Sequence, residues 1–286
     1  MNDLEYLLNQ LFRWYKFMEN EVDDYSLHES YKPLNDVIRR GYIYEYMPFE
    51  KKDIKPIDYK IELPQKPILL YSGGKCSTAL ALEYKNRNPM LFYVGKDNEW
   101  IKEFSAELTL DYRVNDIELN HGNPLYLLYI IGLAILYAVE YHYSPIIYVG
   151  TFEMSSIHNN PISMWSNCVE LIVSFEEVLH QVLPDLQIML PMPSYSYVWD
   201  ILMQNKGYLK YVQHGTNVDR MIFEMAKEDW WIEDCENYLL YIKKLRKIYY
   251  NEIGYKASLK DFWQRYFFYD IRRSKHIPEM EKLFGE

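Results

Sequence analysis

The stretch from Ile68 to Leu82 constrains the fold of this chain more than any other part of its sequence. It begins with a short apolar run, passes through the pair Gly73 and Gly74, and continues with the pattern of an amphipathic helix. Two adjacent glycines let the backbone approach an anion closely, because no Cβ intervenes. The N–H groups at the start of a helix, together with its dipole, attract negative charge. The stretch therefore predicts a strand, a phosphate-binding turn and a helix, in that order.

Alternating strand and helix patterns continue after this stretch. They predict an α/β fold, with a parallel sheet of about five strands flanked by helices. The strands are expected at 68–71, 90–94, 112–119, 146–149 and 186–190, and the helices at 77–86, 98–108, 123–142, 166–182 and 195–204. Asn123 is predicted to cap the helix at 123–142, with Pro124 at its first position. Ligands bind outside the carboxyl ends of parallel strands, so the loops that begin at Ser72 and Gly150 should lie at the binding edge.

The two ends of the chain have different patterns. Residues 1–65 are expected to form an N-terminal extension, with a helix over residues 1–20. A tyrosine-rich segment at 41–46 has the character of a strand. Residues 208–286 are expected to form a helical C-terminal region, with amphipathic helices over 228–250 and 258–272.

Composition excludes several classes of protein. Apolar residues make up 49% of the chain, which is enough for a sizeable core, and the net charge of −10 argues against broad nucleic-acid binding. The three cysteines, Cys76, Cys168 and Cys235, are far apart, so neither a disulfide framework nor a cysteine-rich zinc site is expected. The first residues are polar and acidic, unlike a secretory signal, and the longest apolar run, 125–139, is short for a membrane span. A cytoplasmic protein is therefore expected.

The turn from Ser72 to Ser77 has the sequence Ser-Gly-Gly-Lys-Cys-Ser. It fits neither a Walker loop nor the G-x-G-x-x-G loop of dinucleotide-binding proteins. It resembles the Ser-Gly-Gly-x-Asp-Ser signature of the PP-loop superfamily of ATP pyrophosphatases, with Cys76 in place of the aspartate. The alternative is a glycine turn between a strand and a helix that binds no ligand.

A second polar segment follows the predicted strand 146–149 and contains Gly150, Thr151 and Glu153. Farther along, Cys168 and Glu170 stand at the start of a predicted helix. This order looks similar to that of the 7-cyano-7-deazaguanine (preQ0) synthases, a branch of the PP-loop superfamily, although the spacing here is longer. Those enzymes also have a C-terminal cysteine-rich zinc site, which this chain lacks. The resemblance covers roughly residues 66–205, and it makes 66–207 the expected nucleotide-binding domain.

The resemblance implies that ATP is split between its α and β phosphates. A carbonyl or carboxylate oxygen of the substrate is adenylated, pyrophosphate leaves through the loop, and a nucleophile such as ammonia or sulfur displaces AMP. ATP and Mg²⁺ are the implied ligands, zinc is not expected, and no residue is assigned to a metal. The acceptor is an unidentified small molecule or macromolecule, and a protein partner or a homo-oligomer stays open.

The resemblance also assigns roles to particular residues, with adenine expected near the end of the second strand. The implied nucleotide-binding residues are Ser72, Gly73, Gly74, Lys75, Cys76, Ser77, Thr78, Val94, Gly150 and Thr151. The implied catalytic residues are Lys75, Ser77 and Glu153.

Cys76 leaves three interpretations open. A thiol cannot replace a carboxylate as a ligand of Mg²⁺, which is a hard cation. At a helix N-terminus the pKa of a thiol should fall, which favours a reactive thiolate. Alternatively, the side chain packs under the loop, or it marks an altered or lost metal role.

Two further functions stay open. One is a catalytically degenerate nucleotide-binding protein that acts as a sensor or subunit, and the other is a sulfur-transfer enzyme of the phosphoadenylyl-sulfate reductase kind.

Overall fold

The computed structural model divides by its internal contacts into two units. Unit 1 comprises Met1–Tyr71 and Tyr84–Met192, and unit 2 comprises Ser72–Glu83 and Pro193–Glu286. The structure describes residues 3–19, 32–42, 60–63, 66–120, 123, 125–149, 169–191, 193, 195–213, 243, 246–247 and 251. The predicted C-terminal helices therefore lie largely outside the described residues, although the few described positions there, 243, 246–247 and 251, are helical.

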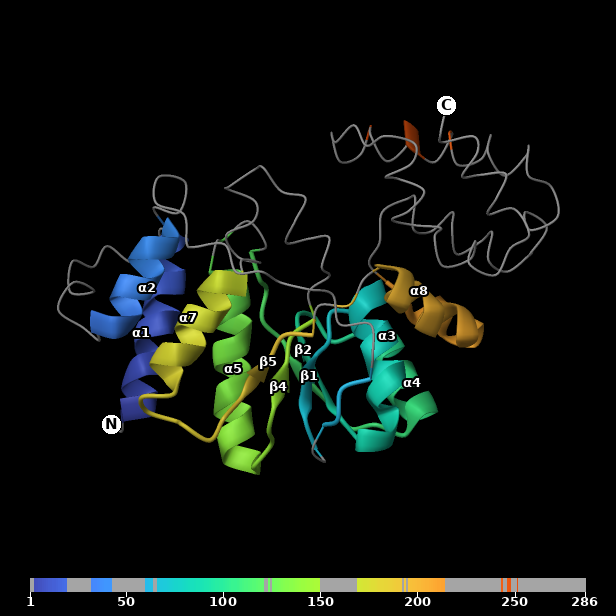
Figure 1. Ribbon diagram of the computed structural model, residues 1–286, viewed down its shortest axis with the longest axis horizontal. Helices are drawn as coiled ribbons and strands as arrows, with labels where there is room; N and C mark the ends of the chain where they lie inside the picture. The colour runs from blue at the N-terminus through green and yellow to red at the C-terminus, as the bar shows by residue number, and fades with distance from the viewer. Residues whose placement is uncertain are drawn as a thin grey trace. The chain divides into compact units, whose positions relative to one another are not determined.

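Five parallel strands form one sheet in unit 1, in the order β3-β2-β1-β4-β5 (Figure 1). Ile68 of β1 lies opposite Met90 of β2 on one side and opposite Ile146 of β4 on the other. Strand β1 is therefore the central strand, and the predicted α/β fold with a five-stranded parallel sheet is confirmed. The strands are β1 Ile68–Leu70, β2 Met90–Val94, β3 Tyr112–Asn115, β4 Ile146–Ile147 and β5 Ile188–Met189.

Helices of unit 1 lie on both faces of this sheet, with α5 and α7 on one face and α4 on the other (Figure 1). Ile68 and Leu70 belong to the core cluster that includes residues of α5 and α7. Tyr71 stacks on Phe104 of α4, with ring centroids 5.3 Å apart. The intervening Leu69 is also fully buried, so β1 is apolar on both faces, as is usual for parallel sheets. The helices are α1 Asp3–Met18, α2 Lys32–Tyr42, α4 Glu99–Leu108, α5 Tyr126–Tyr141, α7 Val169–Leu179 and the short 3₁₀ helix η2 Lys85–Arg87.

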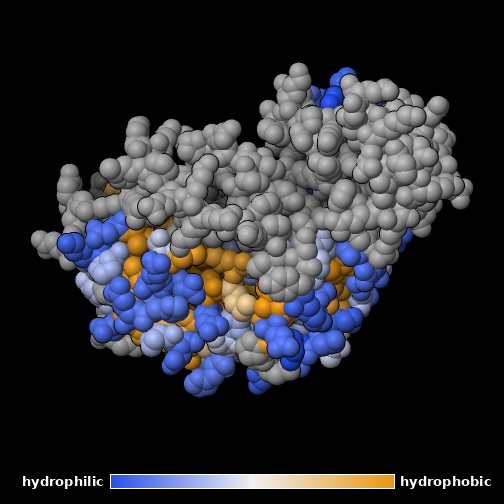
Figure 2. All heavy atoms as spheres, in the orientation of Figure 1, coloured by the Kyte–Doolittle hydropathy of each residue, from blue (hydrophilic) through white to orange (hydrophobic). Residues whose placement is uncertain are grey.

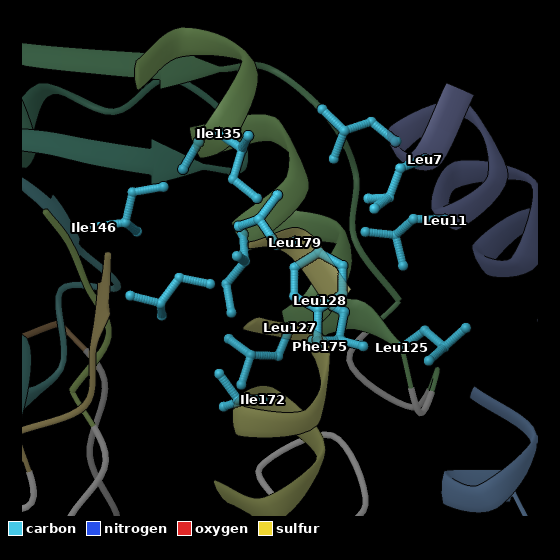
Figure 3. Packing of buried hydrophobic residues seen from close by; sticks show 14 of the residues in the cluster. Leu7, Leu11, Leu125, Leu127, Leu128, Ile135, Ile146, Ile172, Phe175 and Leu179 are labelled. Atoms are coloured by element: carbon cyan, nitrogen blue, oxygen red, sulfur yellow. The ribbon is translucent and has the colours of Figure 1, made fainter. Parts of the chain in front are cut away.

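The N-terminal helices add an outer layer to unit 1, because α1 packs on α5 and α2 packs on α7. Leu7 and Leu11 of α1 enter the same core as Leu128 of α5 and Phe175 of α7 (Figure 3). Helix α1 approaches α5 closely at Gly132, where a Cβ would lie 2.9 Å from Cε1 of Phe12. The predicted N-terminal helix is thus confirmed, and it completes the core of the α/β sheet.

Helix α5 carries apolar side chains around most of its circumference, whereas a surface helix usually has one polar face. Seven of its residues are buried, while Leu136, Val139 and Tyr141 are 42%, 41% and 51% exposed. Apolar residues also reach the visible surface of the described region in Figure 2, in the part of the molecule where Figure 1 draws α5 and α7. None of the described helices is long and apolar enough to cross a membrane.

Unit 2 contains the loop after β1 and most of helix α3. Helix α8 has the bounds that the sequence predicts, and a 3₁₀ helix, η4, follows it directly. Buried apolar residues anchor these two segments: Val198, Ile201, Leu202, Leu209 and Tyr211. The elements are α3 Lys75–Tyr84, α8 Tyr195–Gln204 and η4 Lys206–Tyr211.

Two sequence-based predictions are wrong in detail. Gly41 and Tyr42 were expected in a strand, but they end helix α2. The buried residues of this helix, Leu34, Asn35 and Ile38, recur at helical spacing. The rest of the expected strand, residues 43–46, lies outside the described residues. Asn123 does not cap α5, because the helix begins later and Leu125 holds the N-cap position. Pro124 lies outside the described residues.

Substitution of Gly132 tests the contact between α1 and α5. We expect Gly132→Leu to lower the free energy of unfolding by about 1–3 kcal/mol, because the new side chain overpacks the space that Phe12 and Leu11 occupy. Gly207→Ala is the matched control, since a Cβ at Gly207 meets no atom within 4 Å. Denaturant unfolding measures both variants; equal stability of the two would contradict the close packing of α1 on α5.

Candidate functional site

The predicted phosphate loop begins where the pairing of the central strand ends. The N–H of Tyr71 donates to the carbonyl of Phe92 at 2.9 Å, which extends the β1–β2 ladder by one residue. Ser72 follows and is exposed, whereas Ser77 and Thr78 in the first turn of α3 are 4% and 0% exposed. The chain thus passes from a buried strand into an exposed turn and then into a buried helix.

The side chains of Ser72 and Ser77 close the loop in a ring of hydrogen bonds. The N–H of Gly74 donates to Ser72 Oγ at 3.3 Å, and the two serine oxygens lie 3.2 Å apart. Ser77 Oγ donates to the carbonyl of Gly74 at 3.1 Å and accepts from the N–H of Ser72 at 3.3 Å. Because Ser77 donates to Gly74, the proton between the two serines comes from Ser72. The serines at the first and last positions of the motif therefore define the shape of the loop.

The backbone of the loop explains its glycines and its helix start. Gly73 has φ = +75°, a left-handed conformation that favours glycine. The N–H of Thr78 donates to the carbonyl of Gly74 at 2.9 Å, so Gly74 accepts the first backbone bond of α3. The amides of Lys75, Cys76 and Ser77 lie in the first turn, where an α-helix supplies no acceptor of its own. This arrangement is suited to an anion.

Gln213 contacts the loop from a distant part of unit 2. Its backbone N–H donates to the carbonyl of Gly73 at 2.8 Å. Sequence reasoning missed this residue, because a backbone-to-backbone bond needs no particular side chain. Glycine turns adopt more than one conformation, so a bond to the carbonyl of a glycine restricts the loop.

Lys75 and Cys76 are half-buried, and Cys76 is a thiol that takes part in no disulfide. In the described part of the chain, no group of three or more His, Cys, Asp or Glu side chains could hold a metal ion. The N–H groups, hydroxyls and ammonium of the loop fit phosphate oxygens. The thiol at the position of the PP-loop aspartate does not fit Mg²⁺, which prefers hard oxygen ligands.

Val94 is the last residue of β2 and is half-buried in unit 1. The register of β2 against β1 sets Phe92 opposite Leu70, so Val94 lies at the carboxyl edge of the sheet. Gly95 follows with φ = +146°, and a Cβ there would lie 2.7 Å from Tyr93 Oη. The backbone at this edge therefore passes close to an aromatic side chain.

Aromatic rings cluster at the same edge of unit 1. The ring of Trp100 lies 5.8 Å from that of Tyr71 and 5.6 Å from that of Tyr93, between centroids. Burial raises the pKa of the Tyr93 phenol, and a hydrogen bond with Asn98 partly opposes this shift. The phenol is therefore protonated at neutral pH.

Several predicted site residues lie outside the described residues. These are Gly150, Thr151, Glu153, Cys168 and Cys235. The structure brings the predicted residues from Ser72 to Thr78 together in one loop, and it places Val94 in unit 1. The second polar segment stays a prediction.

A polar hollow of about 520 Å³ lies between the C-terminal end of α1 and the loop after β3, lined by Tyr15, Glu19, Glu118, Leu119 and Asn120. The Glu19 carboxylate accepts hydrogen bonds from the side-chain amides of Asn120, at 3.0 Å, and Asn123. Asn123 also donates to the carbonyl of Tyr15 at 3.0 Å and accepts from the N–H of Leu125 at 2.8 Å. No periodic pattern or motif predicts this cluster, because its residues come from distant segments of the sequence.

Comparison with protein families and with curated proteins assigns no family to the chain. The chain matches no protein-family model, and a search of curated proteins found no match either. The sheet is compatible with Rossmann-like and HUP folds, and the assignment of function therefore depends on the site.

Replacement of Asn123 tests the polar cluster at the end of α1. Asn123 is 2% exposed, so Asn123→Ala leaves the N–H of Leu125 without its acceptor and removes a donor from the carbonyl of Tyr15, which keeps its bond from the N–H of Glu19. We expect a loss of about 1–3 kcal/mol in the free energy of unfolding, measured by urea denaturation. The control is Asn98→Ala, at an exposed position where the amide donates to the carbonyl of Lys96 at 3.4 Å. A loss no greater than that of the control would show that the cluster does not stabilise the fold.

Proposed function

We propose that the chain binds ATP with its phosphates on the loop from Ser72 to Thr78 and adenylates a carbonyl or carboxylate acceptor. The observation that carries this proposal is the hydrogen-bonded ring of Ser72, Gly74 and Ser77 in front of α3. Its position directly after the central strand of a parallel sheet supports the proposal, because ligands of such sheets bind at the carboxyl edge.

The loop offers donors of a kind that a pyrophosphate group requires. The two O–H···O bonds of the ring are 3.1 and 3.2 Å long, whereas such bonds are usually 2.7–2.8 Å long, and the N–H···O bond from Gly74 is 3.3 Å long, whereas 2.9–3.0 Å is usual. Replacing them with shorter bonds to charged phosphate oxygens therefore loses little and gains charge-assisted bonds. Lys75 adds a positive charge from the first helical turn. These groups would stabilise the charge that develops on pyrophosphate as it leaves.

The reaction in this proposal balances without a redox partner. An oxygen of the acceptor attacks the α-phosphorus of ATP, and the bond from that phosphorus to the bridging oxygen of the β-phosphate breaks. Pyrophosphate leaves with the electron pair of the broken bond, and the acceptor carries AMP as an ester or mixed anhydride. A nucleophile such as ammonia or sulfur then attacks the activated carbon and displaces AMP.

The remaining roles come from the resemblance to PP-loop proteins. Adenine is proposed at the end of β2, near Val94. In the second polar segment, Gly150 and Thr151 are proposed to bind the nucleotide and Glu153 to act in catalysis. Mg²⁺ would supply charge neutralisation at the phosphates, but the thiol of Cys76 does not suit it as a ligand. The loop therefore supplies no metal ligand to the proposed reaction.

Ligand-dependent unfolding tests the binding step. ATP and pyrophosphate, each at about 100 times its dissociation constant, should add about 2.7 kcal/mol to the free energy of unfolding. Ser77→Ala should lower the affinity for both ligands about 10- to 100-fold, because it removes a hydrogen bond to a charged group. Ser105→Ala is the control, since this helical serine is equally buried and its hydroxyl donates to the carbonyl of Lys102 in unit 1.

Gly74→Asp should abolish stabilisation by either ligand, because it sets a carboxylate among the groups that would bind phosphate. The outcome against the proposal is a wild-type protein that neither ATP nor pyrophosphate stabilises, with or without Mg²⁺. Release of AMP and pyrophosphate in the presence of an acceptor would then separate an enzyme from a protein that only binds.

The second candidate function is that of a nucleotide-binding protein without turnover, and Cys76 is the residue that favours it. If the thiol marks a decayed metal site, Cys76→Asp should create or raise Mg²⁺-dependent AMP release and leave pyrophosphate affinity within a few-fold of wild type. Cys76→Ser controls for the loss of the thiol alone. If wild type releases AMP and Cys76→Ser does so too, the result would instead favour a competent enzyme that needs no carboxylate at position 76.

A further inference from the structure

The peptide that joins Gly73 to Gly74 is held at both of its polar ends. Its carbonyl accepts the N–H of Gln213 at 2.8 Å, and its N–H donates to Ser72 Oγ at 3.3 Å. A peptide unit is planar, with its C=O and N–H pointing to opposite sides in the trans form. Fixing the direction of the Gly73 carbonyl therefore also fixes the direction of the Gly74 N–H.

We infer that the backbone N–H of Gln213 positions the phosphate loop for its anion. A glycine pair rotates its central peptide at low cost, because neither residue has a Cβ. A rotated peptide would turn the Gly73 carbonyl toward the site, where it would repel phosphate oxygens. The bond from Gln213 opposes this rotation. This inference rests on the proposed function, since it names phosphate as the group that the loop binds.

The segment that presents this N–H is itself well anchored. Gln213 follows η4, in which Leu209 and Tyr211 are each 5% exposed. The N–H of Val212 donates to the carbonyl of Leu209 at 3.1 Å, which closes the end of that 3₁₀ helix. Loop and anchor belong to the same unit, because Ser72–Glu83 groups with Pro193–Glu286. The segment 205–213 of unit 2 thus acts as a support for the loop.

Two variants of Gln213 separate its backbone from its side chain. Gln213→Pro removes the N–H, and Gln213→Ala keeps it. Val212 has φ = −77° and ψ = +101°, an extended conformation that is favourable before a proline. We expect Gln213→Pro to lower the affinities for ATP and pyrophosphate by about 2- to 13-fold, which corresponds to the net free energy of one hydrogen bond. We expect Gln213→Ala to bind both ligands as wild type does.

Adenosine is the control ligand, because it lacks phosphate. If the N–H of Gln213 only supports the fold, its removal should lower the affinities for adenosine and for ATP alike. If it positions the loop, the affinity for adenosine should not change. Equal affinities of the two variants for pyrophosphate would overturn the inference. Failure of wild type to bind ATP or pyrophosphate would instead overturn the proposed function, so the two failures are distinguishable.

A measurement on the wild-type chain keeps the inference testable if Gln213→Pro does not fold. Pyrophosphate should slow hydrogen exchange at the amide of Gln213, because the ligand stabilises the loop conformation that this amide holds. Exchange at the N–H of Ser105, which lies outside the loop in unit 1, should not change. Slowed exchange at the loop amides without any change at Gln213 would overturn the inference.

Discussion

The burial of β1 is the constraint on which the rest of the structure depends. Its backbone pairs with β2 on one side and β4 on the other, and all three of its residues are buried. The register of such a strand is fixed from both sides, because a slip of one residue would take its N–H and C=O groups out of register with β2 and with β4 at once. The chain must therefore leave the sheet just after Tyr71. The loop from Ser72 onward starts from a fixed point, which a site that binds by backbone N–H groups requires.

A second constraint comes from α5, which is too apolar to serve as a surface helix. One of its sides packs on β1 and β4, and another is covered by α1 at Gly132. The N-terminal helices thus cover apolar surface that α5, which packs directly on the sheet, would otherwise expose to water. The cluster around Glu19 and Asn123 sits where α1 ends and α5 begins, so polar bonds fix the relative position of these two helices.

The sequence predicted those features that are encoded locally. A strand, a glycine turn and a helix follow one another within Ile68–Leu82, and hydrophobic periodicity identified all five strands. Helix α2 was not predicted, and Tyr42 at its end was assigned to a strand because tyrosine favours strands, whereas packing on α7 decides the outcome. Asn123 has the residue type of a helix cap, but its side chain bonds to Tyr15 and Glu19, which lie far away in the sequence. The bond from Gln213 to Gly73 was beyond prediction for the same reason, since it joins two backbones and depends on no side chain.

In the proposed function, the thiol of Cys76 at the position of the aspartate in the PP-loop signature would separate two tasks, phosphate binding and metal binding. Phosphate binding depends on backbone N–H groups and on Ser72 and Ser77, none of which needs a particular side chain at position 76. Metal binding does need a hard oxygen ligand, which a thiol does not supply. The geometry of the loop is therefore compatible with the proposed binding of a nucleotide, in which the phosphates would be neutralised without a carboxylate at position 76. Lys75, next to the substitution, is the residue of the loop that offers a permanent positive charge, so neutralisation by an ammonium group is the chemically simplest substitute for the missing metal ligand.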